Sequence, residues 1–63
     1  MNEEFVKKII EIAKHGTFKS TIISLAANYG VKQKDVGKHI KEARKHGLYN
    51  VKIAQHDVYY QCD

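Results

Sequence analysis

Lysine side chains recur along one part of the chain at the spacing of a helix turn. Six of the eleven basic residues lie between Val31 and His46, and the whole net charge of +4 can be assigned to this stretch. At about 100° per residue, a helix would bring four of its lysines into one row. These are Lys34, Lys38, Lys41 and Lys45. Positive charge concentrated on one element is typical of a surface that binds a polyanion.

The other sides of this expected helix carry different residue types. Val36, Ile40 and Ala43 would line the side opposite the lysine row, which predicts that this side is buried. Asp35 and Glu42 would project together from one flank, about a quarter turn from the row. We therefore expect the lysine row not to be neutralised from within its own helix. The plainer alternative is a solvated, lysine-rich surface without a ligand.

The sequence predicts three helices, which precede a segment where the apolar residues change from helical spacing to strict alternation. Asn2 is a suitable N-cap for a helix over residues 2–15, whose wide apolar face indicates contacts with two other elements or a subunit interface. A short extended piece at residues 17–19 leads to a second helix over 20–29, capped by Ser20 or Thr21. The lysine-rich helix follows over residues 32–46. Gly30 and Gly47 are placed to end the second and third helices.

After Gly47 the apolar residues alternate with polar ones. Tyr49, Val51 and Ile53 alternate with polar neighbours, and the same pattern resumes from Val58 to Cys62. This predicts a β-hairpin over residues 48–62. The fold class expected is therefore α+β, mostly α, in a single domain that spans residues 1–63.

The spacing of Ala26, Gly30 and Val36 is the most specific local signal. Two helices that cross steeply need a small residue at the crossing, a turn residue that tolerates positive φ, and a branched apolar residue that packs back. The segment Leu25 to Val31, followed by Val36, resembles the helix-turn-helix motif of DNA-binding regulators. With a helix before the motif and a hairpin after it, nearly the whole chain resembles a winged helix-turn-helix domain, and its small size is similar to that of phage, viral and prokaryotic regulators.

This resemblance implies double-stranded DNA as partner and a transcriptional regulator as function. In the family, the second helix of the motif enters the major groove and its N-terminal half contacts base edges. Carried onto this chain, the base-contacting residues would be Gln33, Lys34, Gly37, Lys38 and Lys41. The phosphate-contacting residues would be Ser20, Thr21, Lys32, Arg44, Lys45 and Lys52. Helix capping explains Ser20 and Thr21 equally well, and a tolerated helix glycine explains Gly37.

Other classes of function find little support in the sequence. The four histidines and Cys62 lack the spacing of a metal site, and no phosphate loop, nucleophile elbow or carboxylate pair is present. We therefore expect no enzyme, no cofactor, no metal and no small-molecule substrate. The longest apolar runs are far short of the ~20 residues that span a bilayer, which predicts no membrane association. A lone cysteine fits a reducing cytoplasm.

Size and hairpin composition leave two points open. Sixty-three residues are near the lower limit for one stable core, so we expect a homodimer. The hairpin offers only Lys52 as a basic residue, whereas the wings of the family are commonly longer and more basic. A winged-helix module that binds another protein, such as a phage or viral factor docking on a host protein, is therefore the alternative to DNA binding.

Overall fold

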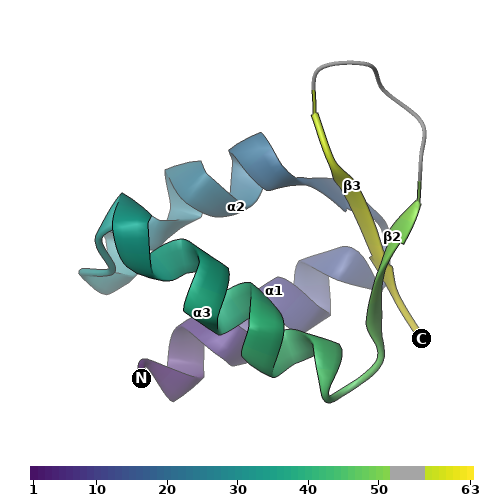
Figure 1. Cartoon of the computed structure of the whole chain (residues 1–63), viewed down its shortest axis with the longest axis horizontal. Coiled ribbons are helices and arrows are strands. Elements are labelled where there is room, and N and C mark those ends of the chain that lie inside the picture. Colours follow the sequence, from purple (N-terminus) through teal and green to yellow (C-terminus); the bar gives the residue numbers. More distant parts are fainter. Residues whose placement is uncertain (52–56) are drawn as a thin grey trace.

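The computed structural model describes residues 1–51 and 57–63. Within them the chain is mostly helical, with three helices and a small three-stranded antiparallel sheet (Figure 1). The elements are α1 (Glu3–Ala13), β1 (Thr17–Phe18), α2 (Lys19–Ala26), the 3₁₀ turn η1 (Ala27–Tyr29), α3 (Gln33–Arg44), β2 (Leu48–Val51) and β3 (Tyr59–Cys62). The α+β class is thus confirmed. Lys52 and its expected phosphate contact lie outside the described residues.

Helix α1 begins as the sequence predicts. The side-chain oxygen of Asn2 accepts a hydrogen bond from the backbone N–H of Phe5 at 3.0 Å, and Glu3 and Glu4 occupy the first turn near the positive end of the helix dipole. Phe5 and Ile9 are fully buried, and α1 contacts both α3 and β3. The wide apolar face therefore packs against two elements, as one of the two readings of this face expected.

Helix α2 begins one residue earlier than predicted and has a different cap. Its N-cap is Phe18, which has no side-chain capping bond, so Ser20 and Thr21 lie inside the first turn. The prediction that one of them caps the helix is wrong. A backbone hydrogen bond from Lys19 to the carbonyl oxygen of Val58, at 2.8 Å, ties this helix start to the sheet instead.

The connection between α2 and α3 has the local conformations that the spacing predicts. Gly30 adopts φ = 68° in the left-handed region, which an L side chain rarely adopts. The N–H of Val31 donates to the carbonyl oxygen of Ala26 at 3.0 Å and closes the end of the helical segment. Ala26 and Val36 are both buried, and α2 packs against α3. The turn therefore fixes α3 against α2 through a small residue and a branched one.

The sheet contains a strand that the sequence did not assign. Strands β2 and β3 pair antiparallel with Leu48 opposite Cys62, which confirms the pairing expected of a hairpin. Thr17 and Phe18, expected only as an extended piece, pair with β3 on its other side, so β3 is the central strand. The described strands are shorter than the predicted span of 48–62. The sheet closes one end of the helical layer (Figure 1).

One core joins all three helices to the sheet. Its largest fully buried side chains are Phe5, Ile9, Ile22 and Val36. Leu48, Tyr60 and Cys62 add the inner face of β2 and β3 to the same cluster. Because α3 contributes Val36, Ile40 and Ala43, one whole side of this helix is fixed in the core and the other side is left to solvent.

Candidate nucleic-acid interface

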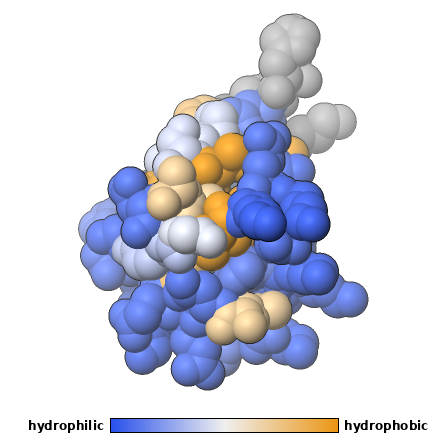
Figure 2. Space-filling model, turned by 90° about the vertical axis from the view of Figure 1, so that its left-hand side faces the viewer, coloured by the Kyte–Doolittle hydropathy of each residue, from blue (hydrophilic) through white to orange (hydrophobic). Residues whose placement is uncertain are grey.

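The solvent side of α3 carries every residue that the sequence assigned to base contact. All five are exposed, and so are the basic residues that follow them at the C-terminal end of the helix. In chain order these exposed residues are Gln33, Lys34, Gly37, Lys38, Lys41, Arg44 and Lys45. Figure 2, which views the molecule from the left-hand side of Figure 1, shows hydrophilic side chains around a smaller apolar patch at the centre of this face. We call the exposed row Lys34, Lys38, Lys41 and Lys45 the lysine row.

The acidic flank of α3 reaches the lysine row, contrary to our expectation. Lys38 Nζ lies 3.8 Å from Asp35 Oδ1, and Lys45 Nζ lies 3.3 Å from Glu42 Oε1. The two lysine side chains remain 75% and 68% exposed. Exposed pairs of this kind contribute about 0–1 kcal/mol, so a phosphate can compete for either lysine. Among the described residues, no ion pair involves Lys34 or Lys41.

His39 fixes the N-terminal half of α3 to the start of α1. Its ring is buried, with its centroid 5.2 Å from that of Phe5. Nδ1 donates to the carbonyl oxygen of Asp35 at 2.7 Å, and Nε2 accepts from the backbone N–H of Asn2 at 3.1 Å. This assignment requires the neutral Nδ1–H tautomer, because Nε2 must accept. His39 is therefore a core histidine with polar contacts and is not part of the exposed surface.

Asn2 connects three elements through its short side chain and its backbone. Besides capping α1, its side-chain amide donates to the carbonyl oxygen of Tyr29 at 2.9 Å. Together with the bond to His39, this joins the beginning of α1 to η1 and to α3. The sequence identified the cap but missed the other two contacts, because they join residues 27 and 37 positions apart. The N-terminal half of α3 is thus held on its buried side by hydrogen bonds through His39 to Asn2.

Arg44 connects the C-terminal end of α3 to the sheet. Its guanidinium carbon lies 5.6 Å from the centre of the Tyr60 ring, within the range of a cation–π contact. Burial raises the pKa of Tyr60, and the positive charge of Arg44 partly offsets that increase. The phenol is therefore neutral and the guanidinium lies over it. The ring restricts where the Arg44 charge can point, which sequence reasoning did not predict.

The first turn of α2 is hydrogen-bonded to Asp57, which lies just before β3. The Ser20 hydroxyl donates to Asp57 Oδ2 at 2.6 Å, and Asp57 Oδ1 accepts from the backbone N–H of Val58 at 2.8 Å. The hydrogen bond from the Ser20 hydroxyl is the main cause that holds the pKa of Asp57 below its usual range. A carboxylate already occupies this hydroxyl, and its charge opposes a nearby phosphate. Ser20, Thr21 and Lys32 are all exposed, but only the Ser20 hydroxyl is seen to donate to a carboxylate.

The described part of the chain has neither a cluster of metal ligands nor a membrane-spanning helix. Within residues 1–51 and 57–63, no group of three His, Cys, Asp or Glu side chains is placed to hold a metal ion. Over the same residues, no helix has the length and apolar character needed to cross a membrane. No protein-family model, curated protein or solved structure matched the chain.

Proposed function

We propose that this protein binds double-stranded DNA, with α3 in the major groove, and acts as a small transcriptional regulator. One observation carries the proposal: the lysine row is exposed along a helix whose opposite side is part of the core. A helix with its side chains is about 10–12 Å across, and the major groove of B-DNA is about 12 Å wide. The exposed side of α3 can therefore approach base edges without any rearrangement of the fold.

The arrangement of elements supports the same proposal. The order α1, β1, α2, α3, β2, β3 agrees with a winged helix-turn-helix domain, in which a helix precedes the motif and a hairpin follows it. The left-handed Gly30 between buried Ala26 and buried Val36 is what the motif requires of its turn. In this reading α2 supports α3 from behind, and the N-terminal half of α3 meets the bases.

The proposed contacts divide by position along α3. Gln33 would pair with adenine N6 and N7, while Lys34, Lys38 and Lys41 would donate to guanine O6 and N7 or to nearby phosphates. Gly37 allows the backbone of α3 to approach the groove closely. Lys32, Arg44, Lys45 and Thr21 would contact phosphates and set the register without reading sequence. Arg44 has the best-defined direction of this group, because Tyr60 lies against it.

Reversal of two charges in the lysine row tests the proposal. We expect the double variant Lys38→Glu and Lys41→Glu to bind a fluorescently labelled mixed-sequence duplex at least about tenfold more weakly, because two phosphate or base contacts become repulsive. Fluorescence anisotropy at about 50 mM salt, where phosphate contacts are strongest, measures this. Both side chains are exposed, so the circular dichroism of the variant should match that of the original chain.

A matched control separates local contact from total charge. The double variant Lys8→Glu and Lys14→Glu changes the net charge equally but lies on α1 and at its C-terminal end. We expect it to retain most of the affinity. Equal losses in the two double variants, or unchanged affinity in the α3 variant, would contradict the proposal. Absence of DNA binding together with a stoichiometric protein partner on purification would favour the protein-binding alternative.

A further inference from the structure

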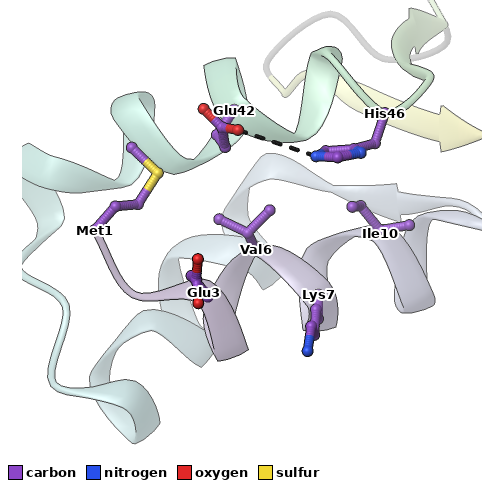
Figure 3. Close-up of a pocket in the computed structure, with 7 residues that line it drawn as sticks. All are labelled: Met1, Glu3, Val6, Lys7, Ile10, Glu42 and His46. Carbon is purple, nitrogen blue, oxygen red and sulfur yellow. Dashed lines mark ion pairs between the residues drawn. The ribbon is translucent and has the colours of Figure 1, made fainter.

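A groove separate from the lysine row runs between α1 and the C-terminal part of α3 (Figure 3). Val6 and Ile10 of α1 point toward the gap between the two helices, and Met1 extends beside them. Ile10 is only partly buried and Met1 is 69% exposed. Val6 is buried between the two helices, so the apolar surface that the described part of the chain leaves uncovered belongs to Ile10 and Met1.

Charges of both signs border this groove. Glu3 and Lys7 flank it on α1, and on the α3 side His46 Nε2 lies 4.0 Å from Glu42 Oε2, which is an ion pair when the imidazole is protonated. These charges nearly cancel, whereas the molecule as a whole carries +4. Two copies that meet here bring together balanced surfaces and keep most of each lysine row out of the contact. The electrostatic cost of pairing two cationic chains is therefore small on this side.

We propose that a second copy of this chain docks on the groove and forms a two-fold symmetric dimer through α1. In such a dimer the two α1 helices run antiparallel, and residues equally far from the axis face each other. An axis that crosses the exposed face of α1 at the level of residue 5 is equally far from Glu3 and Lys7, so it brings Glu3 of each copy to Lys7 of the other. Met1 of each copy then lies within about one residue of Ile10 of the other along the helix. One arrangement thus covers these apolar side chains and pairs the charges.

The position of the groove leaves most of the proposed DNA surface free. Glu42 and His46 project from α3 about a quarter turn or more from the lysine row. Glu42 contacts Lys45 at the C-terminal end of the row, but Lys34, Lys38 and Lys41 do not line the groove, so a dimer formed on this side leaves these three exposed in both copies. Dimer formation needs no DNA, so this inference can fail while the proposed function stands, and the reverse also holds.

The small contact area that α1 can offer limits the expected strength of the dimer. A standard stable interface buries about 800 Å² per partner, about a fifth of the 4328 Å² surface of this chain. Helix α1 is only about 16 Å long at 1.5 Å per residue. The contact therefore belongs at the small end of the range. We expect a reversible dimer with a dissociation constant on the order of micromolar.

Sedimentation velocity of the full chain between about 5 and 500 μM, without DNA, tests the proposal over the expected range of dissociation constants. Glu3→Lys and Lys7→Glu should each weaken the dimer at least about tenfold, since each creates two symmetry-related like-charge contacts. An equal mixture of the two single variants should restore the dimer, because each variant then meets opposite charges. The double variant should also recover it.

Glu4→Lys is the matched control, because it makes the same charge change in the same helix turn but does not line the groove. We expect it to change the dissociation constant by less than about threefold, the scale of a weak exposed interaction. Circular dichroism checks that each variant folds. A chain that stays monomeric at all concentrations, single variants that dimerise like the original, or a mixture that fails to restore the dimer would each overturn the proposal.

Discussion

At the scale of single residues, Asp57 connects the sheet to the beginning of α2. Its carboxylate accepts hydrogen bonds from the Ser20 hydroxyl and from the backbone N–H of Val58. The backbone N–H groups of Lys19 and Ser20 also contribute to its lowered pKa. A negative charge at this position favours the positive end of the α2 dipole. Asp57 therefore places a negative charge beside the first turn of α2 from a distant part of the chain.

Removal of the Ser20 hydroxyl tests this contact. We expect Ser20→Ala to raise the pKa of Asp57 toward its usual value, because the strongest hydrogen bond to the carboxylate is lost. The titration of the Asp57 carboxyl carbon by NMR, in both proteins, measures the change. Thr21→Ala is the control, since Thr21 is not among the causes of the lowered pKa. An unchanged pKa in Ser20→Ala would contradict the assigned hydrogen bond.

The same contact gives stability a defined dependence on pH. A lowered pKa means that the folded state favours the carboxylate, so the contribution is fully present above the unfolded pKa of about 4. It is lost as the pH falls through the lowered pKa of the folded state. Urea unfolding should therefore show a difference between the original chain and Ser20→Ala at neutral pH that shrinks in acid. A difference that grows in acid would contradict the sign.

At the scale of elements, α3 has one exposed position without a side chain. An added Cβ at Gly37 meets no atom within 4 Å, and the residue lies in the interior of the helix. Gly37→Ala should raise the free energy of unfolding by about 1 kcal/mol, the difference in helix propensity between the two residues. Urea unfolding monitored by circular dichroism measures this.

At Gly16, in contrast to Gly37, there is no room for an added side chain. Its φ is +88°, and an added Cβ would overlap the hydroxyl group of Tyr59. Gly16→Ala should therefore lower stability, because both the backbone and the aromatic ring would have to move. If Gly37→Ala destabilises the chain as Gly16→Ala does, α3 does not present this position to solvent.

Elements with a local signal were predicted well, and those that depend on distant partners were not. The N-cap of α1, the glycine turn before α3 and the apolar side of α3 follow from residue types and helix periodicity. Strand β1 has two residues and exists only because β3 pairs with it. The N-cap of α2 is Phe18, which has no side-chain capping bond, and the contact of Ser20 with Asp57 joins residues 37 positions apart, so local preference pointed to the wrong residues.

In the candidate interface, too, the features with a local sequence signal were predicted and those that depend on side-chain reach or distant packing were not. Helix periodicity alone predicts that the lysine row faces away from the core, and the structure confirms that all four side chains are exposed. The contacts of Lys38 with Asp35 and of Lys45 with Glu42 were missed, because flexible side chains can reach across a quarter turn of helix. The anchoring of α3 through His39 and Asn2 was also missed, since it requires the packing of α1 on α3.

At the scale of the whole molecule, the uneven distribution of charge governs how binding should respond to salt. About four phosphates neutralised by each copy predict a slope near −3.6 for the logarithm of the binding constant against that of the salt concentration. A bound dimer doubles this to about −7. Anisotropy titrations between about 50 and 200 mM salt measure the slope over the range where phosphate contacts respond strongly. A slope near zero would contradict a binding surface made of lysines.

The most direct test of the central claim is an NMR titration of ¹⁵N-labelled protein with a DNA duplex. If α3 enters the major groove, the largest changes in amide chemical shift will fall on its exposed residues, from Gln33 to Lys41. Smaller changes are expected at Lys32, Arg44 and Lys45, which would contact phosphates. Changes concentrated on α1, or no changes at a duplex concentration that saturates the anisotropy signal, would contradict the assignment of α3 as the DNA-binding element.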